Sequence, residues 1–446
     1  MSLRPFRFRR AVLSFSCGAA LSASLMLTAC GGGGDSSVGS NLLGGTLSGL
    51  TANGLVLANG NDTLSVAAGA TSFTFDEGIG SSYAVTVQTQ PDGQTCQVSH
   101  GSGSASSGDV TSVSVSCRGY RVYVANTLSN SLAQFAVGSD GSLSALSPAT
   151  VSVPYLPSAL VVNSDGSRAW LDYRDDETVS VLDIDSGGAL SVSSLSSQAA
   201  TFGYALALSP DASHLYAVNY GGASVSQFSL ASSGQPTALS PSSVSTGLAP
   251  YAMAITADGA YAYVANASDD TVSLYAVGST GKLSALSKAT VSVASYGSKP
   301  QGLAVAPGGG WLYVTLAGSA KVLSYRIDSS TGLLTYSSSQ TTGTTPRAIA
   351  LSSDGTRAYV ANAGSATVSQ FLVSGGTLTP MATRTVATGT TPSGVALSPD
   401  GRYAYVSNAG DGTVSQFAVG SGGMLSALST ATVSSGGQSP TSLVVR

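Results

Sequence analysis

Short stretches of alternating hydrophobic and polar residues run through residues 41–118, as in Phe73-Thr74-Phe75 and Tyr83-Ala84-Val85-Thr86-Val87. A period of two places the hydrophobic side chains on one face of a strand. Turn-forming clusters such as Pro91-Asp92-Gly93 separate these stretches. About seven short strands in this segment predict a small β-sandwich of the immunoglobulin-like or transthyretin-like kind.

Two of the four cysteines, Cys96 and Cys117, lie on predicted strands of this sandwich. In an oxidising compartment two such thiols pair, and we expect a structural disulfide between them. The alternative is a reactive thiol pair, which we consider the weaker interpretation. The disulfide would close a loop of 21 positions and stabilise the module by roughly 3 kcal/mol.

From residue 119 onwards the chain repeats itself about every 47 residues. The frame Arg357-Ala358-Tyr359-Val360-Ala361-Asn362 returns as Tyr403-Ala404-Tyr405-Val406-Ser407-Asn408. Asp-Gly steps typical of hairpins, such as Asp400-Gly401, recur between strands. The third position of the frame is always aromatic, at Tyr123, Trp170, Tyr216, Tyr263, Tyr313, Tyr359 and Tyr405. Four strands in each of seven repeats predict a seven-bladed β-propeller over residues 119–446, with the aromatic column in its core.

The order of the strands predicts how the ring closes. We name the four strands of a blade A to D from the channel outwards. Residues 119–446 begin with a B strand and end with a lone A strand, Pro440-Thr441-Ser442-Leu443-Val444-Val445-Arg446. We expect this last strand to complete the first blade, because doing so removes two exposed sheet edges.

Repeats that read Tyr-Val-Ala-Asn, then Thr-Val-Ser, then Ser-Pro-Asp-Gly resemble the YVTN and lactonase-type seven-bladed propellers. That group includes phosphogluconolactonase-like and carboxymuconate cycloisomerase-like proteins. The resemblance covers about residues 120–446 and implies the fold. It implies much less about activity, because the matching residues are turn and packing positions.

The first 40 residues predict export. A basic start with Arg4 and Arg7 precedes a short apolar run over residues 11–26, as in a signal peptide over 1–29. The end of this run, Leu27-Thr28-Ala29-Cys30, resembles the lipobox of bacterial lipoproteins, which implies a lipid on Cys30 and a tether over 30–40. By the same resemblance, Gly31 directly after the cysteine implies that the lipoprotein is sorted to the outer membrane. We therefore expect a cell-envelope lipoprotein that contacts the membrane through this anchor.

Charge and composition exclude several partners. Without the four arginines of the leader, the chain has 14 Lys and Arg and 22 Asp and Glu. This net negative charge does not favour binding to the phosphates of nucleic acid. The chain has two His and no zinc, phosphate-loop or Gly-x-Ser-x-Gly pattern. We accordingly predict no metal and no cofactor.

In a propeller, ligands meet the loops that lead into the A strands and the loops between strands B and C. On this basis we predict ligand-binding residues at Tyr155, Tyr204, Tyr251, Gln301 and Arg347. A lactone hydrolase needs a base for water and a cation or donors for the oxyanion. The candidate catalytic residues are Asp172, Arg174, Asp175, Lys299 and Arg347. A local Asp172–Arg174 ion pair would also explain why the second repeat departs from the others.

Two functions remain open at this point. The first is a binding or scaffold module of the envelope that recognises a protein, a glycan or a small acidic ligand. The second is a lactonase-type hydrolase, of the carboxylic-ester class, acting on a sugar lactone at the channel mouth. Export and the added sandwich favour the binding module, because phosphorylated sugar lactones are cytosolic metabolites.

Overall fold

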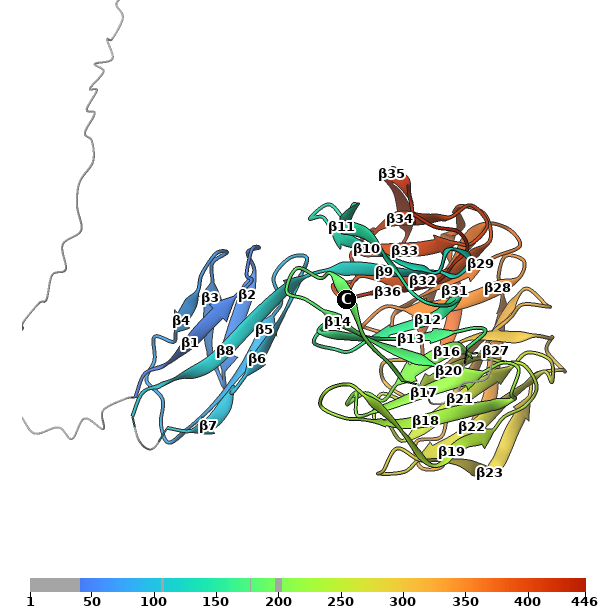
Figure 1. Cartoon of the computed structure of the whole chain (residues 1–446), viewed down its shortest axis with the longest axis horizontal. Helices are drawn as coiled ribbons and strands as arrows, with labels where there is room; N and C mark the ends of the chain where they lie inside the picture. The colour runs from blue at the N-terminus through green and yellow to red at the C-terminus, as the bar shows by residue number, and fades with distance from the viewer. Residues whose placement is uncertain (1–40, 106–107, 177, 197–202) are drawn as a thin grey trace, which may run out of the picture. The chain divides into compact units, whose positions relative to one another are not determined.

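The computed structural model describes residues 41–105, 108–176, 178–196 and 203–446 (Figure 1). Apart from one 3₁₀ turn at Thr127–Ser129, every regular element in these ranges is a β-strand. None of the described residues forms a helix long and apolar enough to cross a membrane. The predicted leader, the lipidated Cys30 and the tether lie outside the described residues.

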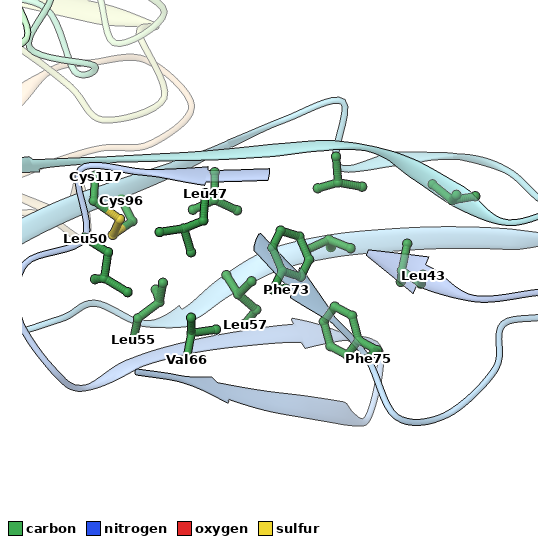
Figure 2. Packing of buried hydrophobic residues seen from close by; sticks show 14 of the residues in the cluster. Leu43, Leu47, Leu50, Leu55, Leu57, Val66, Phe73, Phe75, Cys96 and Cys117 are labelled. Carbon is green, nitrogen blue, oxygen red and sulfur yellow. A yellow bond between two sulfur atoms is a disulfide. The ribbon is translucent and has the colours of Figure 1, made fainter. Parts of the chain in front are cut away.

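The first eight strands form the predicted sandwich. One sheet has the order β4-β1-β8-β6 and the other β3-β2-β5-β7. Their bounds are Leu43–Ser48 (β1), Leu55–Asn59 (β2), Asp62–Val66 (β3), Ser72–Thr74 (β4), Ser82–Thr89 (β5), Gln94–Ser99 (β6), Ser102–Ser104 (β7) and Val110–Gly119 (β8). Hydrophobic side chains from both sheets, among them Leu47, Leu57 and Phe73, pack into one core (Figure 2). Cys96 on β6 lies opposite Cys117 on β8, and the expected disulfide joins them.

Seven four-stranded sheets follow, and they confirm the β-propeller. From the channel outwards, blade one is β36 (Pro440–Val445), β9 (Arg121–Asn126), β10 (Ser131–Val137) and β11 (Leu143–Ser152), blade two is β12 (Pro157–Val162), β13 (Arg168–Tyr173), β14 (Val179–Ile184) and β15 (Leu190–Ser196), and blade three is β16 (Gly203–Leu208), β17 (His214–Asn219), β18 (Ser224–Leu230) and β19 (Pro236–Ser245). Blade four is β20 (Pro250–Ile255), β21 (Tyr261–Asn266), β22 (Thr271–Val277) and β23 (Leu283–Ser292), and blade five is β24 (Pro300–Val305), β25 (Trp311–Leu316), β26 (Lys321–Ile327) and β27 (Leu334–Thr341). Blade six is β28 (Pro346–Leu351), β29 (Arg357–Asn362), β30 (Thr367–Ser374) and β31 (Thr377–Ala387), and blade seven is β32 (Pro392–Leu397), β33 (Tyr403–Asn408), β34 (Thr413–Val419) and β35 (Leu425–Ser434).

The last strand closes the ring as predicted. Strand β36 pairs antiparallel with β9, so the end of the chain completes the blade that the propeller segment begins (Figure 1). Val444 lies opposite Tyr123, and Val445 is buried against Val122. The inner edge of the first blade is therefore covered by the end of the same chain.

The aromatic column joins neighbouring blades by hydrogen bonds as well as by packing. All seven rings are at least 98% buried. The Tyr123 hydroxyl donates to the Gly188 carbonyl of blade two over 2.7 Å. The Tyr405 hydroxyl of blade seven donates to the Gly141 carbonyl of blade one, also over 2.7 Å. The same bond to the next blade is made by Trp170 to Gly234, Tyr216 to Gly281, Tyr263 to Gly332 and Tyr359 to Gly423.

Tyr313 is the exception, because the described residues offer its buried hydroxyl no partner. The next blade joins β30 to β31 through only Gly375 and Gly376, a shorter turn than its counterparts.

We expect Tyr263→Phe to lower the free energy of unfolding by about 1–2 kcal/mol, since it leaves the Gly332 carbonyl unsatisfied. Tyr313→Phe should leave the free energy of unfolding unchanged or raise it. Urea unfolding of both variants tests this, and equal losses would contradict it.

Candidate functional site

A cavity of about 240 Å³ lies where the innermost strands begin. The second residue of an A strand points into it from six of the seven blades: Ser158, Tyr204, Tyr251, Arg347, Ser393 and Thr441. Gln301 holds the same strand position in blade five but is not among the lining residues. Arg174, in the loop after β13, also lines the cavity. The wall therefore combines hydroxyl groups with two guanidinium groups.

The two arginines of this cavity have no acidic partner. The described residues form three ion pairs, Arg168–Asp183, Arg357–Asp354 and Arg402–Asp92, and none of them includes Arg174 or Arg347. The Nε atoms of Arg174 and Arg347 are buried without a hydrogen-bond partner. No Asp, Glu or His lies among the described residues that line the cavity. Both arginines are half-buried, and because a guanidinium without an acidic partner can bind an anion, this arrangement favours an anionic ligand.

Aromatic rings hold Arg174 and build one wall of the cavity. The guanidinium carbon of Arg174 lies 5.0 Å from the ring centre of Tyr204, within cation–π range. The rings of Tyr204 and Tyr251 pack at 4.1 Å between centroids, and the Tyr204 hydroxyl donates to the Tyr251 hydroxyl. Tyr220, 42% exposed, packs on Tyr204 from outside at 5.4 Å. The tyrosines thus form a continuous cluster from the exposed rim into the cavity.

The hydroxyl of Tyr251 stays protonated at neutral pH. Burial raises its pKa. Arg347 and Arg174 act in the opposite direction, but burial outweighs them. Tyr251 is therefore a neutral hydrogen-bond donor beside two cations, and it is unsuited to act as a base.

Asp172, predicted as a candidate base, does not line the cavity. Its carboxyl group is fully buried, accepts a hydrogen bond from the Tyr173 backbone N–H and has no partner for its Oδ2. It sits against Gly203 of blade three, where a Cβ would lie 1.9 Å from Oδ2. The other six A strands begin with proline, so Gly203 gives Asp172 its space. The alternative Asp172–Arg174 ion pair is not formed among the described residues.

Burial raises the pKa of the Asp172 carboxyl well above its usual range. In the unfolded chain the Asp172 carboxyl group ionises near pH 3.9, whereas in the folded protein it stays protonated to a higher pH. The free energy of unfolding therefore falls as the pH rises above about 3.9. We expect Asp172→Asn to raise the free energy of unfolding by at least about 1 kcal/mol at pH 7, with the gain vanishing towards pH 4. Urea unfolding at both pH values measures this. The exposed control Asp175→Asn should show no such difference, and a gain that persisted at pH 4 would contradict the assignment.

The remaining predicted residues lie outside the cavity lining. Asp175 is exposed on the loop that carries Arg174. Lys299 is exposed, and its backbone N–H donates to Asp270. Tyr155 is 42% exposed and packs edge-on against Tyr173 at 5.6 Å. Of the predicted residues, the structure thus brings together Arg174, Tyr204, Tyr251 and Arg347.

The prediction of site residues omitted the hydroxyl side of the cavity. Ser158, Ser393 and Thr441 line it from blades two, seven and one. They hold the same strand position as Tyr204 and Arg347, so strand position alone indicates them. The described residues contain no group of three His, Cys, Asp or Glu side chains that could hold a metal ion.

Comparison with known proteins gives a family and a set of structural relatives. Residues 204–446 match the model of the family described as "Lactonase, 7-bladed beta-propeller". A candidate 6-phosphogluconolactonase from Bacteroides fragilis superimposes with a TM-score of 0.64 at 19% identity, covering 73% of this chain and 98% of its own. The periplasmic gluconolactonase of Pseudomonas aeruginosa does so with a TM-score of 0.63 at 22% identity, covering 73% and 98%. No curated protein sequence matches this chain. At these identities, the structural likeness shows the fold.

Proposed function

Because the chain belongs to the family of seven-bladed β-propeller lactonases, we propose that it hydrolyses a sugar lactone that carries an anionic group. The observation that carries this proposal is the pair of unpaired guanidinium groups, Arg174 and Arg347, in one cavity at the channel mouth. The family favours lactone hydrolysis over the binding module that the sequence favoured. The related 6-phosphogluconolactonase candidates and gluconolactonase point to the same substrate class.

The cavity suits the charges that this reaction produces. Water adds to the lactone carbonyl, the former carbonyl oxygen becomes negative, and the ring C–O bond then breaks to give a hydroxy acid. Arg347 and Arg174 attract the anionic group of the substrate and the developing oxyanion. The described lining offers no carboxylate or imidazole base. We therefore assign catalysis to positioning and electrostatic stabilisation of an attacking water.

The proposed location is the bacterial envelope. The Cys96–Cys117 disulfide fits an oxidising compartment, and one structural relative is a periplasmic gluconolactonase. Within the proposal, a lipid on Cys30 anchors the chain to the outer membrane. The partner it recognises is then a small acidic ligand that reaches the envelope, rather than a protein or a glycan.

Proton release from lactones tests the proposal with the full chain. We expect 6-phosphoglucono-δ-lactone to be hydrolysed well above its spontaneous rate. The kcat/KM for this lactone should exceed that for neutral glucono-δ-lactone at least 10-fold, because only the phosphorylated substrate adds an anion for Arg174 and Arg347. Hydrolysis of neither lactone above the spontaneous rate would refute the proposal.

A further inference from the structure

We infer that the hydroxyl of Tyr251 is a catalytic hydrogen-bond donor to the lactone carbonyl oxygen, and that Tyr204 positions it. This inference rests on the proposed function and names the group that meets the reacting atoms. Tyr251 is the second residue of β20, and its side chain lines the cavity together with Arg174 and Arg347.

The hydrogen bond between the two tyrosines leaves Tyr251 with a proton to donate. Tyr204 donates to the Tyr251 oxygen, and a hydroxyl that accepts one bond still has its own O–H. The described residues give that O–H no acceptor, so it is free for a ligand in the cavity. Tyr204 is itself fixed between the guanidinium of Arg174 and the ring of Tyr251.

The charges around Tyr251 define what it can do. Its hydroxyl stays protonated because burial raises its pKa despite the two nearby arginines. A base or nucleophile would need the opposite, a hydroxyl that ionises easily. A neutral O–H beside two guanidinium groups presents only donors to a ligand. Such a set matches an oxygen that gains negative charge in the transition state.

The step that this donor assists balances without further reagents. The water oxygen bonds to the carbonyl carbon, and the carbonyl π electrons move to the oxygen that accepts the hydrogen bond from Tyr251. When the C=O bond forms again, the ring C–O bond breaks. The ring oxygen leaves with its electron pair and takes the proton that the attacking water loses. Tyr251 keeps its own proton throughout.

Steady-state hydrolysis of 6-phosphoglucono-δ-lactone by three tyrosine variants tests this role. Tyr251→Phe removes one oxygen and keeps the ring packed on Tyr204, so it should lower kcat about 100-fold and leave KM within about threefold. Tyr204→Phe should lower kcat about 10-fold at unchanged KM, because it only frees the Tyr251 hydroxyl to turn. Tyr220→Phe is the matched control from the same ring cluster, and its kcat should remain within twofold of wild type.

The double variant Tyr204→Phe/Tyr251→Phe separates positioning from general structural support. If Tyr204 acts through the Tyr251 hydroxyl, the double variant is no slower than Tyr251→Phe alone, whereas independent effects would multiply. Thermal melting of every variant monitors folding. A Tyr251→Phe enzyme with the wild-type kcat, or one changed only in KM, overturns the inference while the lactonase proposal stands. A wild-type chain that hydrolyses no lactone overturns both.

Discussion

Deleting residues 440–446 should open the propeller and lower its free energy of unfolding by about 5 kcal/mol or more. The deletion unpairs the inner edge of β9, removes Val445 from the core beside Val122, and breaks the hydrogen bond between the side chains of Thr441 and Thr127. Because an unpaired hydrophobic edge invites pairing with another chain, we also expect soluble aggregates. Thermal melting followed by circular dichroism, together with size-exclusion chromatography, measures both effects.

Rescue in trans provides the control for this deletion. A peptide of residues 440–446 should restore part of the lost melting temperature, whereas a scrambled peptide of the same composition should not. An unchanged melting temperature in the truncated chain would mean that β36 is not needed to close the ring.

Replacing both cavity arginines should remove most activity while the fold remains stable. We expect Arg347→Ala to weaken binding of 6-phosphogluconate about 30-fold, which corresponds to about 2 kcal/mol for a charged hydrogen bond. The double variant Arg174→Ala/Arg347→Ala should lose at least about 100-fold in kcat/KM. The free energy of unfolding should stay within about 1 kcal/mol of wild type, because neither guanidinium has an acidic partner among the described residues.

Arg384→Ala is the matched control for the arginine variants, since Arg384 is exposed on the outer strand β31. It should change neither binding nor hydrolysis, which titration calorimetry and proton release measure. A large loss of stability without any effect on binding would instead make Arg347 a structural residue.

The topology was open to prediction because the repeat itself carries it. The repeat pattern places a lone A strand at the end of the chain and a first blade without an A strand. The two were therefore expected to pair, and β36 does pair with β9. The mouth residues followed from the same logic, since the second position of each A strand lies at one end of the channel. Tyr204, Tyr251 and Arg347 share that position and line one cavity.

Other features depend on packing that a repeat pattern does not specify. Asp172 was a candidate base, yet residues two apart on a strand share a face, so it shares the buried face of Trp170 between blades. A second signal of the burial of Asp172 was Gly203, which replaces the proline that begins the other six A strands and leaves space for the Asp172 carboxyl group. The hydrogen bonds of the aromatic column depend on the length of a turn in the next blade. Only the structure shows this dependence, because the Tyr263 hydroxyl reaches such a turn and the Tyr313 hydroxyl does not.

A crystal structure of the protein with 6-phosphogluconate, the product of the proposed reaction, tests the central claim most directly. The account predicts one molecule in the cavity at the channel mouth, with an anionic group on the guanidiniums of Arg174 and Arg347 and a carboxylate oxygen that accepts a hydrogen bond from the Tyr251 hydroxyl. An empty mouth at a product concentration that saturates inhibition, or a product molecule bound elsewhere on the chain, would contradict it.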